Sequence, residues 1–91
     1  MSPETFGFAK ALELMKSGSR VARMNWKNAT AVFLVQGSKF TVNRAPLNQF
    51  FAEGTEVEYR PHLDLIAADG TVGVWSVSNA DILAEDWHVV A

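Results

Sequence analysis

The sequence has no cysteine, and this absence excludes several classes of protein. Without cysteine the chain forms no disulfide framework, has no thiolate nucleophile and builds no cysteine zinc site. It also lacks an apolar run of the roughly 18 residues needed to cross a bilayer, and no charged-then-apolar leader opens it. We therefore expect neither membrane insertion nor secretion, and we expect a cytoplasmic protein.

Length and composition predict one small globular domain. The 91 residues are 48% hydrophobic and 20% charged, which is too apolar for a disordered chain. Two separate cores would each fall below the size at which chains usually fold unaided. We therefore predict a single domain over residues 1–91.

The net charge of −2 conceals two oppositely charged halves. Residues 1–52 carry seven Lys and Arg against two Glu, a net charge of +5, whereas residues 53–91 carry eight acids against Arg60, a net charge of −7. Either the halves neutralise each other, within the fold or across a subunit contact, or the first half holds a pocket for an anion. The overall balance argues against nonspecific binding of duplex nucleic acid, which requires a basic face with little opposing charge.

The first segment of the chain predicts a helix. Before Gly18 the apolar residues recur at helical spacing in two series. One series is Phe6, Ala9, Leu12 and Met15, and the other is Phe8, Leu12 and Met15. Ser2 or Thr5 can cap this helix, and Pro3 fits its first turn. Ser17 and Gly18 supply its stop.

After Gly18 the pattern changes to the period of two that is typical of strands. The predicted strands are Arg20–Met24, Ala31–Val35, Phe40–Val42, Val57–Ala67, Val72–Ser76 and Trp87–Val90. Asp69-Gly70 predicts a hairpin turn, and Pro61 interrupts one strand, as at a sheet edge or a bulge. Short helical connectors are predicted in Ala45–Phe51 and Ser78–Ala84. We therefore expect an α+β fold, with an N-terminal helix packed on a mainly antiparallel β-sheet.

The tryptophans indicate a binding site. Trp26 lies in a predicted turn, Asn25–Asn28, where burial within a monomer is hard to arrange, and Trp75 ends a hairpin strand before a polar run. An indole among small polar groups and a nearby cation suits stacking on a base, worth roughly 1–3 kcal/mol per base. The alternative is that each indole fills the core or a subunit contact, and for Trp87, in an alternating strand, we favour the core.

The start of the predicted helix is a second candidate site. Thr5–Phe8 offers free backbone N–H groups, an aromatic ring and, at Gly7, room for close approach, which together suit phosphate oxygens. An ordinary capped helix end is the alternative. Arg23, Lys39 and Arg44 are candidates for phosphate contacts, or are simply solvated.

Signals for catalysis are weak. The sequence has no Gly-rich phosphate loop, no paired-His metal spacing and no Ser elbow, so we expect no enzyme, no cofactor and no metal site. A small nucleotide hydrolase would have to use His62 with Asp64, or Asp81 with Glu85. Asp81 follows Ser78 by three residues, the spacing of a capping box, so it either caps a short helix or contacts a ribose.

Motifs along essentially the whole chain resemble a known family. They are the helix ending in Gly18, Val21-Ala22-Arg23, Asn25-Trp26, the central block Phe40–Leu47, Gly54–Val57, Tyr59–His62, Asp64, Trp75 and the closing string Asp81–Trp87. Together they are similar to the small phage-associated domain family that includes the second type of Thoeris anti-defence protein.

The resemblance implies a binding protein rather than an enzyme. Members of that family act as sponges for cyclic ADP-ribose isomers made by bacterial TIR-domain proteins, and so block the immune effector downstream. Some hold cyclic dinucleotides in a separate pocket. The resemblance also implies a homotetramer in the cytoplasm of the infected host, with ligand pockets where subunits meet.

The resemblance and the residue chemistry together give one set of candidate ligand-binding residues. They are Gly7, Phe8, Arg23, Trp26, Asn28, Arg44, Trp75 and Asp81. Arg44, in the central block, is the candidate for a cyclic-dinucleotide pocket. The leading alternative is a protein-interaction or virion accessory module that binds no nucleotide, with Trp26 and Phe50-Phe51 as contact anchors.

Overall fold

The structure is a computed structural model of the chain, and it describes residues 4–91. The predicted roles of Ser2 and Pro3 therefore lie outside the described residues. The elements in chain order are α1 (Phe8–Lys16), β1 (Arg20–Arg23), β2 (Ala29–Val35), β3 (Ser38–Thr41), the 3₁₀ turn η1 (Leu47–Gln49), β4 (Glu56–Tyr59), β5 (His62–Ala67), β6 (Val72–Val74), α2 (Asn79–Leu83) and β7 (Trp87–Val90).

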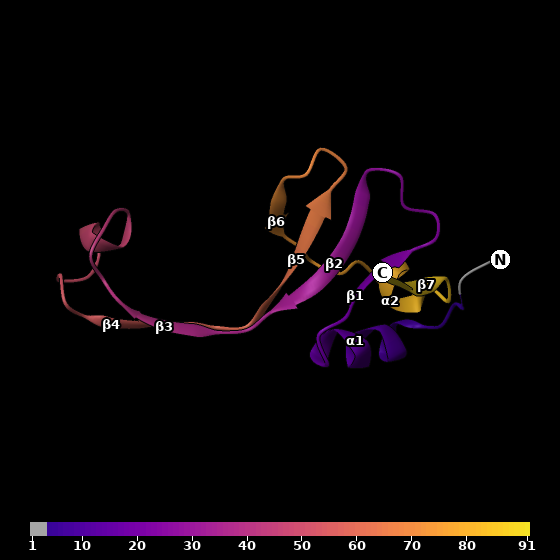
Figure 1. Cartoon of the computed structure of the whole chain (residues 1–91), viewed down its shortest axis with the longest axis horizontal. Coiled ribbons are helices and arrows are strands. Elements are labelled where there is room, and N and C mark those ends of the chain that lie inside the picture. The colour runs from indigo at the N-terminus through magenta and orange to yellow at the C-terminus, as the bar shows by residue number, and fades with distance from the viewer. Residues whose placement is uncertain (1–3) are drawn as a thin grey trace.

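Five of the strands form one antiparallel sheet with α1 against one of its faces (Figure 1). Their order is β6-β5-β2-β1-β7, so the last strand of the chain, β7, pairs with the first, β1. Val21 of β1 lies opposite Val32 of β2 on one side and Val89 of β7 on the other. The predicted α+β class and the mainly antiparallel sheet are confirmed.

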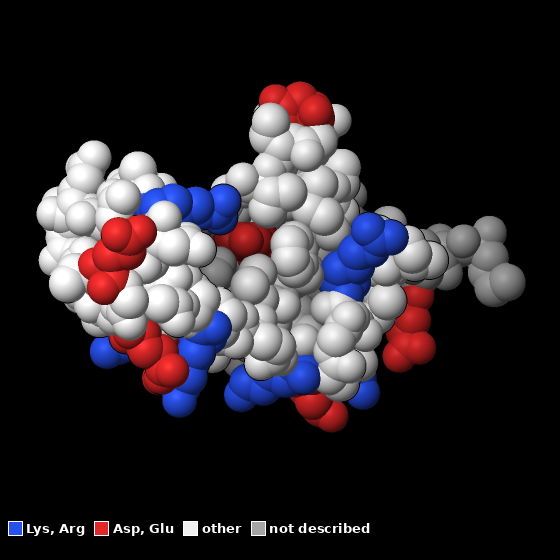
Figure 2. Space-filling view, turned by 60° about the vertical axis from the view of Figure 1, so that its left-hand side comes forward, with Lys and Arg blue, Asp and Glu red and all other residues white. Residues whose placement is uncertain are grey.

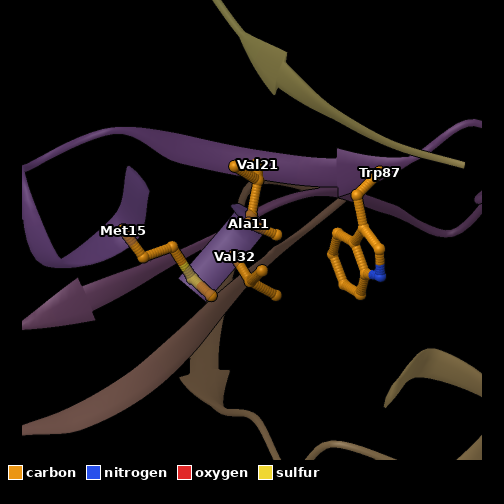
Figure 3. Packing of buried hydrophobic residues seen from close by; sticks show 5 residues of the cluster. All are labelled: Ala11, Met15, Val21, Val32 and Trp87. Carbon is orange, nitrogen blue, oxygen red and sulfur yellow. The ribbon is translucent and has the colours of Figure 1, made fainter. Parts of the chain in front are cut away.

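A small apolar core joins α1 to the middle of this sheet. Its buried side chains come from α1, β1, β2 and β7 and point toward one another (Figure 3): Ala11, Met15, Val21, Val32 and Trp87. On α1 the buried positions Ala11 and Met15 are four residues apart, as one face of a helix requires. Ala9 is exposed, so the prediction that it lies on the buried face of the helix was wrong.

The helix begins later than the sequence predicted. Phe6 is not helical, because its backbone pairs with Trp87 through two hydrogen bonds of 2.9 and 3.0 Å. The chain stays extended through Gly7, which is the N-cap and has no side-chain cap. Thr5 therefore does not cap the helix, and that prediction was wrong. The predicted stop is confirmed, since Ser17 is the C-cap and Gly18 takes the left-handed conformation (φ +104°) that favours glycine.

Residues 36–61 form an arm that projects from the body of the molecule (Figure 1). The arm contains β3, η1 and β4, and its two strands make a separate antiparallel sheet. It gives the molecule its extents of 53 × 26 × 25 Å. The sequence predicted one strand over Val57–Ala67 with a break at Pro61, but the two parts belong to different sheets, β4 in the arm and β5 in the body.

The remaining connections follow the local sequence signals. Asp69-Gly70 turns the chain between β5 and β6, with Gly70 at φ +87° and the Asp69 carboxylate accepting bonds from the N–H and hydroxyl of Thr71. β6 ends at Val74, two residues earlier than predicted, although the Trp75 N–H still donates to the Leu63 carbonyl at 2.9 Å. No helix within residues 4–91 is long and apolar enough to span a membrane.

Replacing Trp87 tests whether its indole is the centre of the core. We expect Trp87→Ala to lower the free energy of unfolding by about 3–5 kcal/mol, because a large buried side chain leaves a cavity. Leu83→Ala, which truncates a side chain that is 77% exposed, should change it by less than about 0.5 kcal/mol. Urea unfolding at one fixed protein concentration measures both. Equal losses in the two variants would contradict the assigned core.

Candidate functional site

Four aromatic rings meet at one end of the body. Trp87 lies at the centre of the group, with ring centroids 5.2 Å from Trp26, 5.4 Å from Phe8 and 6.0 Å from Trp75. Trp26 and Trp75 also contact each other, edge to face, with centroids 6.0 Å apart. Such tilted and edge-to-face contacts are the favoured arrangements of aromatic pairs.

The two outer tryptophans are half-buried rather than free. The Trp26 backbone N–H donates to the Arg23 carbonyl at 3.2 Å, which closes the turn after β1 and turns the indole toward Trp87. The sequence suggested that burial of Trp26 would be hard to arrange in a monomer. In the structure, edge-to-face contacts with Trp75 and Trp87 bury part of the Trp26 indole within one chain. Trp87 itself is fully buried, as predicted.

An ion triad connects β1 to α2 and to the start of β7. The Arg23 guanidinium donates through Nε to Asp86 at 2.9 Å and through a terminal nitrogen to Asp81 at 3.0 Å. The side chain of Arg23 is only 16% exposed and that of Asp81 13%. The two carboxylates, Asp86 first, raise the pKa of Arg23 above its ordinary value and keep it charged.

Asp81 is the most heavily used polar residue of this region. Its carboxylate accepts the Ser78 N–H and hydroxyl, while the Ser78 hydroxyl accepts the Asp81 N–H, so the predicted capping box is confirmed. Its backbone carbonyl accepts the indole N–H of Trp87 at 2.9 Å. Burial raises the pKa of Asp81, but hydrogen bonds from Ser78 and Arg23 outweigh burial and hold it below its usual range.

A surface hollow of about 360 Å³ lies beside the aromatic group. Its lining runs along the turn after β1: Arg23, Asn25, Trp26, Lys27, Asn28 and Ala29. Three of the predicted ligand-binding residues therefore meet here, an indole, an amide and a guanidinium. The hollow combines an aromatic surface with polar groups, which is the chemistry that base stacking and phosphate contacts require.

The start of α1 differs from the open phosphate site that the sequence suggested. A carboxylate oxygen of Glu85 lies 2.7 Å from the position that a Cβ on Gly7 would occupy, so a larger residue at Gly7 would displace it. A carboxylate near a helix N-terminus is stabilised by the helix dipole. A phosphate bound here would meet the negative charge of Glu85 first.

Arg44 lies apart from the other candidates, in the arm. It lines a second hollow, of about 680 Å³, together with Phe40, Pro46 and Tyr59. The rings of Phe40 and Tyr59 stack there with centroids 5.2 Å apart. The predicted residues therefore fall into two groups, seven around the aromatic group and α1, and Arg44 alone in the arm.

Two pairs of residues were proposed for hydrolysis, and only His62 and Asp64 are shown in contact with each other. In the other pair, Asp81 with Glu85, the Asp81 carboxylate is already bound by other residues. His62 Nε2 lies 3.3 Å from Asp64 at the junction of arm and body, and the His62 Nδ1 lies 3.2 Å from the Arg60 carbonyl. Asp81 is already bound by Ser78 and Arg23. Within residues 4–91 no group of three or more His, Asp or Glu is placed to hold a metal ion.

Sequence reasoning missed two residues of this region. Asp86 belongs to the closing string Asp81–Trp87 but was not among the predicted ligand-binding residues, although its carboxylate lies 2.9 Å from Nε of Arg23 in the triad. Lys27 lies in the predicted turn Asn25–Asn28 and was not among the predicted ligand-binding residues, although it lines the hollow. The signal for Lys27 was available, because it is adjacent to Trp26, whereas nothing in the sequence places Asp86 against a residue 63 positions away.

Two comparisons with known proteins cover almost the whole chain. Residues 6–90 match the family of Thoeris anti-defense 2-like domains. The chain is also similar to the Thoeris anti-defense 2 protein of Bacillus phage SP01, with 32% identity over 89 residues that span 92% of this chain and 93% of that protein. The resemblance drawn from the sequence motifs is confirmed.

The low pKa of Asp81 predicts a pH-dependent contribution to stability. The folded protein holds this carboxyl ionised more firmly than the unfolded chain does, so its contribution is full at neutral pH and lost as pH falls through the folded pKa. Asp81→Asn should lower the free energy of unfolding by about 1–3 kcal/mol at pH 7. The difference in free energy of unfolding between Asp81→Asn and the parent should become smaller below about pH 4, because the carboxyl of the parent is then protonated in the unfolded chain and increasingly in the folded protein.

The matched control is Asp69→Asn. Asp69 also has a pKa lowered by hydrogen bonds, from Thr71, but it lies exposed at a hairpin tip away from the triad. Urea unfolding followed by tryptophan fluorescence at several pH values compares the two. If Asp81→Asn matches the parent at pH 7, the triad does not stabilise the fold.

Proposed function

We propose, from the membership of this chain in the Thoeris anti-defense 2-like family, that it is a phage protein that suppresses the Thoeris defence of the infected bacterium. The family match over residues 6–90 and the identity to the phage SP01 protein support this role. Such a protein acts in the host cytoplasm, where the defence signal is made.

The mechanism we propose is sequestration of a TIR-derived cyclic ADP-ribose isomer without its cleavage. The observation that carries this proposal is the hollow lined by Trp26, where an indole lies beside the amides of Asn25 and Asn28 and the cation of Lys27. A cyclic ADP-ribose isomer presents a base, two sugars and a doubly charged pyrophosphate. Stacking, hydrogen bonds and one cation are the interactions that it requires, and sequestration needs no nucleophile, general base or metal.

We propose that the binding protein is a homotetramer whose pockets are completed at subunit contacts. The hollow at Trp26 is an open surface feature, so a second wall is needed to enclose a ligand of this size. Two apolar surfaces are available for the contacts. One is the sheet face opposite α1, where Phe33, Ile66 and Val90 line another hollow of about 440 Å³. The other is the arm, where Phe50 is 75% exposed.

A cyclic dinucleotide is the second ligand that we propose, in the arm. The hollow at Arg44 pairs a guanidinium with the stacked rings of Phe40 and Tyr59, which suits a phosphate beside a base. On the face shown in Figure 2, basic and acidic side chains are interspersed over the molecule. This mixed charge favours small ligands held in local hollows over a nucleic acid backbone.

Replacing Trp26 tests the sponge mechanism. We expect Trp26→Ala to weaken binding of a cyclic ADP-ribose isomer at least about tenfold, because a stacking surface is lost. Isothermal calorimetry with a panel of these isomers measures the change. Leu83→Ala, which truncates an exposed apolar side chain outside the hollow and outside the proposed contact surfaces, should leave the affinity unchanged.

Further measurements separate the alternatives. Light scattering shows whether Trp26→Ala still forms the parent oligomer; a variant that only dissociates would make Trp26 an interface residue. Heating the loaded protein should release intact nucleotide, whereas a hydrolysed product would favour the hydrolase built on His62 and Asp64.

No thermal shift with any cyclic nucleotide, together with pull-down of a protein partner, would favour the interaction module.

Replacing Arg44 tests the pocket in the arm. We expect Arg44→Ala to weaken binding of cyclic dinucleotides by about tenfold and to leave binding of cyclic ADP-ribose isomers unchanged, because the two hollows are separate. Arg60→Ala removes another cation of the arm that does not line the hollow, and should match the parent. Equal effects of Arg44→Ala and Arg60→Ala would assign the change to general electrostatics.

A further inference from the structure

We infer that Lys27, rather than Arg23, is the cation that contacts the pyrophosphate in the hollow at Trp26, and that it makes the hollow select pyrophosphate-bearing nucleotides over uncharged nucleosides. This inference rests on the proposed function and names a residue that determines the specificity of the same site.

The positive charge of Arg23 is already used inside the protein. Its guanidinium is already bound by two carboxylates, Asp86 at 2.9 Å and Asp81 at 3.0 Å. One cation between two anions gives the triad a net charge of −1. A dianionic pyrophosphate that approached Arg23 would therefore meet a repulsive group, and it would have to displace a carboxylate to reach the guanidinium.

Lys27 is the second cation in the lining of the hollow. It lines the same hollow as Trp26, it is exposed, and within residues 4–91 its ammonium makes no ion pair. Its charge is therefore available to a ligand, in contrast to that of Arg23. A flexible ammonium with three donors can reach phosphate oxygens from several directions, so it can follow a ligand whose base is fixed by stacking.

The groups that line the hollow differ in how they respond to the charge of a ligand. The indole of Trp26 offers its stacking surface to any base, charged or uncharged, and so does not distinguish a nucleoside from a nucleotide. Asn25 and Asn28 offer uncharged amides. Lys27 is thus the group in the lining whose attraction depends on the charge of the ligand and is not already used inside the protein.

The test compares two single-charge deletions. Lys27→Gln removes the cation in the hollow, and Lys16→Gln removes an exposed cation at the end of α1 that does not line it. We expect Lys27→Gln to weaken binding of the cyclic ADP-ribose isomer that the parent binds best by about tenfold, which corresponds to about 1.4 kcal/mol. Lys16→Gln should stay within about twofold, and Lys27→Arg should restore most of the affinity.

Ionic strength and an uncharged probe complete the experiment. The parent should bind less tightly as salt rises, and Lys27→Gln should show a smaller dependence. The affinity for adenosine should be the same in both proteins. Unchanged affinity of Lys27→Gln for the isomer, with the parent binding well, would overturn the inference and leave the sponge proposal intact. A parent that binds none of the isomers would instead overturn the proposed function.

Discussion

The buried indole of Trp87 is the contact on which the rest of the body depends. Its ring fills the space between α1 and the sheet and touches the rings of Phe8, Trp26 and Trp75. Its N–H satisfies the carbonyl of Asp81, and its backbone pairs with Phe6. One side chain therefore fixes the start of α1, the turn after β1, the end of β6 and the position of α2, and each of these segments supplies a candidate ligand-binding residue. Under the proposed function, affinity and stability are coupled at this site, because its aromatic surface continues into the core.

The ion triad gives the same region its polar framework. Arg23 belongs to the basic half of the sequence, and Asp81 and Asp86, 58 and 63 residues away, belong to the acidic half. Part of the charge asymmetry is therefore neutralised within the fold. In the arm, the register of β3 with β4 also places Lys39 of the basic half opposite Glu58 of the acidic half. Charge neutralised in this way stabilises the fold but does not bind a ligand. A basic segment of sequence thus overstates the attraction that the folded surface holds for an anion.

Local signals predicted most of the fold, and they failed where distant residues meet. The capping box at Ser78 and Asp81, the stop at Gly18 and the hairpin at Asp69-Gly70 each depend on neighbours in sequence, and each is confirmed. The start of α1 depends on the pairing of Phe6 with Trp87, 81 positions away by residue number, and was misplaced. The arm was missed because periodicity shows that a segment is extended but not which sheet it joins. Trp87 was recognised as core from the alternation of its strand, whereas the contacts of Phe8, Trp26 and Trp75 with it depend on how the elements cross.

The arm sets a different physical problem from the body. A two-stranded sheet is marginally stable alone in water, and this one places Phe40 opposite Val57 while its alternate positions are charged or polar. Its own apolar contacts bury Val42 but leave Phe50 and Tyr59 exposed. The body, in contrast, is closed by α1 on one face only. For the self-association that we propose, the exposed rings of the arm and the sheet face opposite α1 supply two apolar surfaces, and burying them against each other would lower the free energy of both. Under the proposed tetramer, ligand binding would then be sensitive to protein concentration, since a pocket completed by a second copy exists only in the assembled form.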